Sequence, residues 1–324
     1  TPLYSSAASD VYKRQLLDKQ LGDPVIEQGE APAPAPLAAI VRAEEKDQAK
    51  LAEVQSWCRE VEGAVRDLKW DVAPCQALTW KVGGTSVRGR PLVYAEFGDP
   101  SAQNVTLILS MVHGDEITPL FLGLKLAEWV RDNPRLVNNT RVVIAPLVNP
   151  DSFYSKPRTR TNARGVDVNR NFPTADWKAR AHKLWKAKFG SNPRRFPGKE
   201  ANSEPETLFQ QELIRNVRPS KILSIHAPLN FMDYDGPTTL SLERFPREYV
   251  QECMKLKSRV NAVSGGFFPG SLGNYSGQEL GIPTFTLELP TAEAHKAEKY
   301  WLQFRTGVST MIDGEKGAIT VALG

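Results

Sequence analysis

The chain has 324 residues, of which 41% are hydrophobic, so it is long enough to bury one large core or two modest ones. Its 41 basic and 37 acidic residues leave a formal net charge of +4, which is too balanced to indicate nucleic-acid binding. No apolar run approaches the roughly 18 residues of a membrane span, so no transmembrane segment is expected. Basic residues gather locally at Lys156, Arg158, Arg160, Arg164 and Arg170, which favours a small anionic substrate.

The first 36 residues are expected to be a linker or a disordered segment. The Pro/Ala-rich run Ala31–Ala39 has the composition of a stiff spacer. The stretch Tyr4–Gln15 resembles a translated sequencing adapter, which predicts that the natural start and any export signal are missing from this sequence. No signal peptide is visible at the start of the chain.

A helical appendage is expected over residues 37–77. Within Val41–Leu68, apolar residues recur every three or four positions, as is typical of an amphipathic helix. Cys58 and Cys75 lie near the end of this helix. The sequence leaves two states open for them, a disulfide, which would indicate an oxidising compartment, and a pair of reduced thiols.

Residues 78–324 alternate between strand and helix patterns, which indicates an α/β domain whose sheet is covered on both faces. Strands are expected at Thr79–Val82, Leu92–Phe97, Val105–Met111, Arg141–Val148, Lys221–Ile225 and Thr284–Leu289. Helices are expected at Ile117–Arg131, Glu206–Asn216 and Phe245–Val263.

Two of the four histidines, His113 and His226, directly follow apolar strands, where ligands bind in open α/β sheets. Glu116 stands three residues after the first of them. Two imidazoles and one carboxylate are the ligand set of a catalytic zinc site, which keeps a fourth position open for water. His182 and His295 lie in polar helical stretches and are expected at the surface.

Glu288 lies between leucines in an apolar strand, so its carboxylate must be paired, solvated in a cleft, or raised in pKa. A buried salt bridge would explain it structurally, whereas near zinc it would act as a general base. The loop Lys156–Pro173 is polar and rich in arginine. Guanidinium groups bind carboxylates and stabilise oxyanions, as an enzyme that cuts next to a free carboxyl terminus requires.

Together these segments resemble the zinc carboxypeptidase family of the carboxypeptidase A type, over roughly Leu78–Arg305. The motifs that carry the resemblance are HGDE at His113–Glu116, TRT at Thr159–Thr161, GVDVNRNFP at Gly165–Pro173, IHAP at Ile225–Pro228 and TLELP at Thr286–Pro290. The resemblance implies a mixed, mostly parallel central sheet with helices on both faces and one zinc ion per chain.

The resemblance also implies a role for each matching residue. The zinc ligands would be His113, Glu116 and His226. Glu288 would be the general base, and Arg160 would polarise the scissile carbonyl. Asn169 and Arg170 would hold the terminal carboxylate of the substrate.

Three differences from the animal enzymes qualify this assignment. Arg158 is an alternative to Arg160, because the loop that follows differs in length. Gly265–Phe268 stands where the pancreatic enzymes carry a mobile tyrosine, and Asp115 replaces an arginine between the zinc ligands. Hydrolysis is therefore expected to be retained, but not the preference for ordinary C-terminal residues. Asp115 could instead contact a substrate ammonium.

Within the family, the resemblance is strongest to bacterial murein peptide amidases. It is carried by HAPLNFMDYDGP at His226–Pro237, NSEPET at Asn202–Thr207 and FPGSLGNYSGQELGIP at Phe268–Pro283. It implies hydrolysis of the γ-D-glutamyl–meso-diaminopimelate bond in peptidoglycan-derived peptides, which have an anionic terminus and a zwitterionic end.

Two other functions remain open from the sequence. One is a zinc deacylase of the aspartoacylase or succinylglutamate desuccinylase type, and the other is a non-catalytic module that binds muropeptides. The linker, the helical appendage and a Cys58–Cys75 bond would favour a periplasmic location. A cytoplasmic location, where peptidoglycan fragments are recycled, is the alternative.

Overall fold

The computed structural model describes residues 37–236 and 268–313, with side chains from Asp47 onward. The chain divides into two compact units, Thr1–Lys46 and Asp47–Gly324. Apart from the first residues of helix α2, all the described elements belong to the second unit. The expected helix Phe245–Val263 lies outside the described residues, and the boundaries expected after residues 36 and 77 stay predictions.

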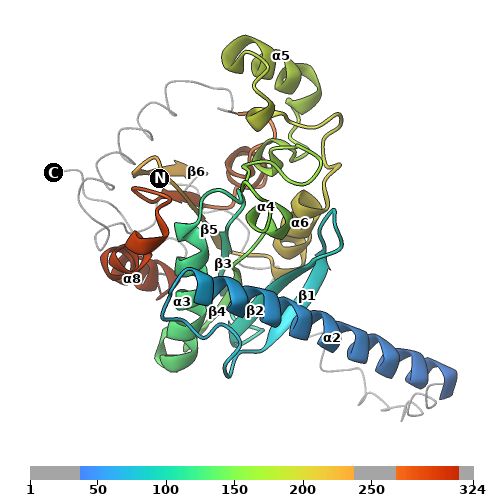
Figure 1. The fold of residues 1–324 in the computed structure, drawn as a ribbon, viewed down its shortest axis with the longest axis vertical. Coiled ribbons are helices and arrows are strands. Elements are labelled where there is room, and N and C mark those ends of the chain that lie inside the picture. Colours follow the sequence, from blue (N-terminus) through green and yellow to red (C-terminus); the bar gives the residue numbers. More distant parts are fainter. Residues whose placement is uncertain (1–36, 237–267, 314–324) are drawn as a thin grey trace, which may run out of the picture. The chain divides into compact units, whose positions relative to one another are not determined.

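A seven-stranded mixed sheet forms the centre of the described part (Figure 1). Its strands are β1 (Trp80–Thr85), β2 (Pro91–Gly98), β3 (Asn104–Ser110), β4 (Thr140–Ala145), β5 (Lys221–His226), β6 (Phe231–Asp235) and β7 (Thr284–Glu288). Their order is β1-β2-β4-β3-β5-β7-β6. The central strands β4, β3, β5 and β7 are parallel, whereas β2 and β6 pair antiparallel with their neighbours. The mixed sheet expected from the family resemblance is confirmed.

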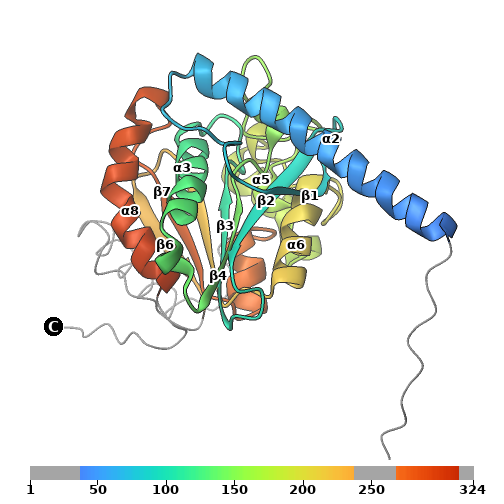
Figure 2. The ribbon, with the colours of Figure 1, turned by 90° about the horizontal axis from the view of Figure 1, so that it is seen from below.

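Helices cover both faces of this sheet, as the sequence predicts (Figure 2). The α-helices are α2 (Leu37–Asp67), α3 (Thr118–Asp132), α4 (Pro150–Phe153), α5 (Trp177–Phe189), α6 (Pro205–Val217) and α8 (Ala297–Asp313). Short 3-10 turns occur at η2 (Pro134–Val137), η3 (Val168–Arg170), η4 (Pro193–Arg195) and η6 (Ala294–Lys296), and a π-helical turn at η5 (Gly273–Glu279). Helices α3 and α8 pack on one face and α6 on the other. Among the described helices, none is long and apolar enough to cross a bilayer.

The burial of strand β3 on both faces of the sheet explains why its sequence is apolar without interruption. Ile108 packs into the core beneath α3 and α8, whereas Leu107 and Leu109 face the core beneath α6. All three side chains are fully buried. Successive residues of a strand point to opposite faces, so a strand buried on both sides carries no polar alternation.

The second half of α2 is held against the rest of the second unit by the apolar face of the helix. Trp57, Val61 and Val65 are buried in the core that lies on the α3 side of the sheet. A disulfide joins Cys58 of this helix to Cys75, with the two Cα atoms 5.9 Å apart. Of the two states that the sequence leaves open, the structure therefore has the disulfide.

The strand order places a crevice at the carboxyl ends of β3 and β5. The chain leaves β3 through α3 and enters β4 on one side, then returns through α6 to β5 on the other side of β3. The chain that follows β3 leads to β4 on one side, and the chain that follows β5 leads to β6 on the other side. These two connections diverge, so a space opens between the carboxyl ends of β3 and β5. His113 follows the first of these strands and His226 ends the second.

Candidate metal centre and active site

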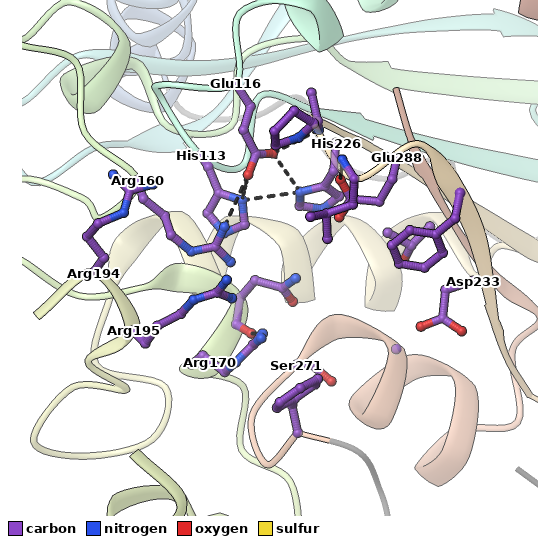
Figure 3. Close-up of a pocket in the computed structure, with 18 of the residues that line it drawn as sticks. His113, Glu116, Arg160, Arg170, Arg194, Arg195, His226, Asp233, Ser271 and Glu288 are labelled. Atoms are coloured by element: carbon purple, nitrogen blue, oxygen red, sulfur yellow. Dashed lines mark hydrogen bonds and ion pairs between the residues drawn. The ribbon is translucent and has the colours of Figure 1, made fainter. Parts of the chain in front are cut away.

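His113, Glu116 and His226 converge in the crevice (Figure 3). Their ligand atoms all lie within 4.8 Å of one another. Glu116 Oε1 is 2.8 Å from His113 Nδ1, and Glu116 Oε2 is 3.0 Å from His226 Nδ1. All three side chains are buried. The structure thus brings His226 to two residues that precede it in the chain by 113 and 110 positions.

The outer nitrogen of each imidazole has its own polar partner. His113 Nε2 lies 3.0 Å from Asp167 Oδ1, and His226 Nε2 lies 2.9 Å from Ser224 Oγ. With the ring protons on Nε2, shared with these oxygens, both Nδ1 lone pairs would be directed at the centre of the cluster. Ligating histidines are typically oriented in this way by a carboxylate or another polar group.

The two inward nitrogens fit a tetrahedral zinc ion. His113 Nδ1 and His226 Nδ1 lie 3.2 Å apart. When both ring protons are on Nε2, the two Nδ1 lone pairs face each other in this buried site, and a cation between them would remove their repulsion. Zinc with bonds of about 2.0–2.1 Å to nitrogen would separate two tetrahedral ligands by about 3.3 Å, which matches this spacing.

The turn that carries His113 and Glu116 depends on a glycine between them. A Cβ at Gly114 would lie 2.3 Å from the Ser152 Cβ and 2.4 Å from the Phe153 nitrogen. Because α4 packs this closely against the turn, only glycine fits there. Glu116 is held further by the Ala227 amide, which donates to its Oε2 at 3.3 Å.

Arg160 and Asp167 form a buried charge network around the metal ligands. Arg160 Nε donates to Asp167 Oδ2 at 2.9 Å, and its Nη1 donates to Glu116 Oε1 at 3.1 Å. Burial opposes ionisation of Asp167, but the charge of Arg160 and the contact with His113 outweigh it and hold the pKa of Asp167 well below the usual value. In the same way, His113 and His226 outweigh burial and lower the pKa of Glu116.

Glu288 lies at the end of β7, next to the metal cluster, and is 9% exposed. Burial raises the pKa of its carboxyl above the usual value, while the charge of His226 acts in the opposite direction. Its Oε2 accepts only a long contact of 3.5 Å from the Leu229 amide. Within the described residues it has no ion-pair partner, so the salt-bridge explanation for this carboxylate is not supported.

Arg170 enters the same pocket from the side opposite β7 (Figure 3). It is 8% exposed, and its guanidinium lies 4.4 Å from the Phe268 ring centroid. Its Nε has no hydrogen-bond partner in the part of the chain that the structure describes. Burial lowers its pKa to about 10, which leaves it charged at neutral pH. Asn169 accepts from the Leu272 amide at 2.8 Å through Oδ1, which leaves its amide NH₂ to a ligand.

The structure distinguishes Arg160 from its alternative. Arg160 lines the pocket of the metal cluster, whereas Arg158 lines a separate pocket beside α2 and donates to the Phe153 carbonyl at 3.0 Å. Asp115 forms an ion pair with Arg194 at 2.7 Å, so its Oδ2 is already paired. Of the two remaining histidines, His295 is exposed as expected, but His182 is half-buried among aromatic rings.

Four pocket or supporting residues were not singled out from the sequence as functional. They are Asp167, Ser224, Asp233 and Asp235. Asp167 stands within GVDVNRNFP, and Ser224 is two positions before His226 on the same face of β5, so strand alternation could have found the latter. The two aspartates lie on β6, where the alternation of Met232 and Tyr234 with the aspartates is the signal that could have found them.

A buried His–Glu–His cluster with an open side, at the carboxyl edge of an α/β sheet, defines a mononuclear metallohydrolase centre. The zinc carboxypeptidase family model matches residues 74–303, and the chain belongs to this family. Zinc is accordingly its cofactor, and the chain is a hydrolase of the metallocarboxypeptidase class. The ligand set predicted from the sequence is the set that the structure assembles.

Individual proteins support the same family. Murein peptide amidase A from Escherichia coli (strain K12) is 31% identical over 222 residues, which cover 67% of this chain and 84% of that protein. The crystal structure of murein-tripeptide amidase from Escherichia coli O157 has a TM-score of 0.51 and 25% identity, covering 74% of this chain and 95% of that one. Carboxypeptidase A from Helicoverpa armigera, with 20% identity and a TM-score of 0.52, covers 79% of this chain and 71% of its own, and shows the fold alone.

Proposed function

We propose that this enzyme hydrolyses an amide bond next to a free carboxyl terminus in peptidoglycan-derived peptides, and that the bond is γ-D-glutamyl–meso-diaminopimelate. The observation that carries the first part is the placement of Arg170. Its buried guanidinium lacks a partner at Nε and faces the same pocket, of about 430 Å³, as the metal ligands. A guanidinium in that position is suited to a substrate carboxylate.

The peptidoglycan substrate is supported by similarity. Murein peptide amidase A is 31% identical to this chain, and the aligned region covers 84% of that protein. The pocket residues Asp233 and Asp235 lie within the stretch His226–Pro237. This stretch is among those on which the sequence resembles that subgroup.

The proposed chemistry divides among a few side chains. When bound by His113, Glu116 and His226, zinc lowers the pKa of water to about 7 and polarises a carbonyl oxygen. Glu288 accepts the proton of the attacking water and then delivers it to the leaving nitrogen. Its raised pKa favours both transfers near neutral pH.

Three further side chains position the substrate and its developing charge. Arg160 uses Nε and Nη1 for Asp167 and Glu116, which leaves Nη2 for the carbonyl oxygen as negative charge develops on it. Arg170 and the Asn169 amide hold the terminal carboxylate. The carboxylate contact fixes the scissile bond in register with the general base.

Mass spectrometry of products from a defined set of muropeptides tests this proposal. We expect a tripeptide that ends in diaminopimelate to release that residue, and the same peptide amidated at its terminal carboxyl to react far more slowly. N-acylated aspartate and succinylglutamate serve as controls, because a zinc deacylase would hydrolyse them. Cleavage of these controls, with intact muropeptides, would overturn the proposal.

We further propose a periplasmic location. The Cys58–Cys75 disulfide supports it, because disulfides persist in oxidising compartments. Fractionation of cells that express the natural gene, with thiol labelling of both cysteines, tests this. A cytoplasmic protein with two free thiols would contradict it.

A further inference from the structure

Strand β6 lines one wall of the active-site pocket with acidic side chains. Met232 and Tyr234 are buried in the core, whereas Phe231, Asp233 and Asp235 point to the other face and line the pocket. This is the alternation of a strand with one face on the core. The two carboxylates therefore face the substrate space together.

These carboxylates continue the line of the general base. Phe231 pairs in register with Glu288, and Asp233 pairs with Thr286, two residues before Glu288 on β7. Two residues along a strand span about 7 Å, so Asp233 lies about that far from the level of Glu288. A long side chain on the residue that is released would reach this level if it ran down the pocket along β6.

Among the described residues, neither carboxylate forms an ion pair with a cation. Within 37–236 and 268–313, Asp235 accepts only a 3.5 Å contact from Gln278, and Asp233 accepts from the Tyr234 amide at 2.8 Å. Burial and the charge of Asp233 raise the pKa of Asp235 to about 7, and burial raises that of Asp233. Both carboxylates are half-buried, and a partly desolvated carboxylate is stabilised by a cationic partner.

The η5 turn encloses Asp235 without supplying that partner. A Cβ at Gly273 would lie 1.9 Å from Asp235 Oδ2, and a Cβ at Gly277 would lie 2.5 Å from the Asp235 Cβ. Glycines at these two positions let the turn lie directly against the carboxylate. The acid is thus enclosed by the fold on one side and open to the pocket on the other.

The opposite wall carries the complementary charge. Arg170 and Arg195 approach from the side across the pocket from Asp233, as Figure 3 shows. The Nε of Arg170 is buried and has no partner, which independently indicates an anionic ligand group in this same pocket. A ligand that satisfies both walls carries a carboxylate and, further along, a cation.

We propose that Asp233 and Asp235 form the subsite for an ammonium group on the side chain of the released residue. The enzyme then selects a diamino acid through its second amine, with the carboxylate next to the scissile bond on Arg170. This inference rests on the proposed function and adds a residue assignment to it. It also makes the side-chain amine, rather than a second carboxylate, the required feature.

A matched pair of dipeptides tests the assignment. γ-D-Glutamyl-L-lysine and γ-D-glutamyl-L-norleucine share the terminal carboxylate and differ in the side-chain amine. We expect the full-length enzyme to prefer the lysine peptide on the order of 10²-fold in kcat/KM, because a buried polar site rejects an analogue that leaves it unpaired. In D233N and D235N, this ratio should fall toward one.

A charge-matched control separates the subsite from general electrostatics. Glu212→Gln removes one negative charge from the exposed face of α6, outside the pocket, and should keep the full ratio. Equal rates for the two peptides in the parent enzyme, or an undiminished ratio in both aspartate variants, would overturn the assignment. Zinc content and the thermal midpoint confirm that each variant is folded.

A binding measurement decides the assignment independently of turnover. Free lysine should raise the thermal midpoint of the zinc enzyme more than free norleucine does, and this difference should vanish in D235N. Equal shifts by the two amino acids would count against the ammonium subsite. If no muropeptide or dipeptide is cleaved but lysine stabilises selectively, the proposed reaction fails while the subsite stands.

Discussion

His226 and Glu288 are register partners on the parallel strands β5 and β7. The Leu289 amide donates to the His226 carbonyl at 2.8 Å, which fixes the alignment of the two strands just beyond them. A metal ligand and the proposed general base are thus held on adjacent strand ends by backbone hydrogen bonds. The distance between the backbones of His226 and Glu288 is set by the spacing of neighbouring strands in a sheet, about 4.8 Å, and not by a flexible loop.

Replacing Glu288 with glutamine tests this arrangement most directly. The variant keeps the size of the side chain but cannot accept the proton from water, so kcat should fall about 10²–10⁴-fold. Zinc content, measured by atomic absorption, should stay at one ion per chain because Glu288 is not a ligand. A variant that turns over as fast as the parent would remove Glu288 from the mechanism.

Asp167→Asn should weaken zinc binding through His113. The carboxylate accepts the His113 Nε2 proton and orients the ring, and loss of such a partner lowers metal affinity about 10–100-fold. Competition with a chromophoric chelator measures this. Ser224→Ala, which removes the acceptor on His226, should have a smaller effect, because a hydroxyl is a weaker acceptor than a carboxylate. Equal or reversed effects would contradict the role given to Asp167.

Arg170→Ala should reduce kcat/KM on the order of 10²-fold for a substrate with a free terminal carboxyl. On the same substrate with its terminus amidated, the variant and the parent should differ little, since the lost contact is specific to the carboxylate. Arg158→Ala is the matched control, because Arg158 lies in another pocket. If Arg158→Ala impaired the enzyme and Arg170→Ala did not, the two assignments would have to be exchanged.

Removal of zinc should both abolish activity and lower stability. Without a cation, the inward nitrogens of His113 and His226 face each other at 3.2 Å in a buried site. A ligand that binds only the folded state stabilises it by about 2.7 kcal/mol at 100 times its dissociation constant. Calorimetry before and after chelation should show a lower thermal midpoint that zinc restores. An unchanged midpoint would indicate that the cluster does not bind metal in the folded protein.

Asp235→Asn should stabilise the protein in the absence of substrate at pH above 7. The folded-state pKa of Asp235 is about 7, above the ordinary value near 3.9, so the folded state binds the proton more tightly than the unfolded state. The contribution of protonated Asp235 to the free energy of unfolding of the parent is therefore lost progressively as pH rises from about 4 to about 7. Asparagine does not titrate, so the loss should be absent from the variant.

Thermal midpoints at pH 5 and pH 8 measure this effect. The advantage of D235N over the parent should be larger at pH 8 than at pH 5. The Glu212→Gln control should show no such difference, because that carboxylate is exposed. A variant that is less stable than the parent at pH 8 would show that the Asp235 charge is compensated in the folded protein.

The sequence alone determined the chemistry of the centre. Two histidines that follow apolar strands, and a glutamate three residues after one of them, predicted a zinc ligand set because strand ends share one edge of an α/β sheet. Apolar runs such as Val105–Met111 located the central strands, since burial on both faces leaves a continuous pattern. The ordered motifs then specified the family and the proposed base.

Only the tertiary structure decided which charges act together. Arg158 and Arg160 are the same type of residue, two positions apart in the chain. Arg158 nevertheless lines a pocket beside α2, whereas Arg160 lines the pocket of the metal cluster. Asp115 stands within the motif His113–Glu116 but pairs with Arg194, whereas Asp233 and Asp235 face the substrate space from strand β6, which was not among the expected strands. The environment of a charge depends on residues distant in the chain, so local sequence does not encode it and the packing of the elements does.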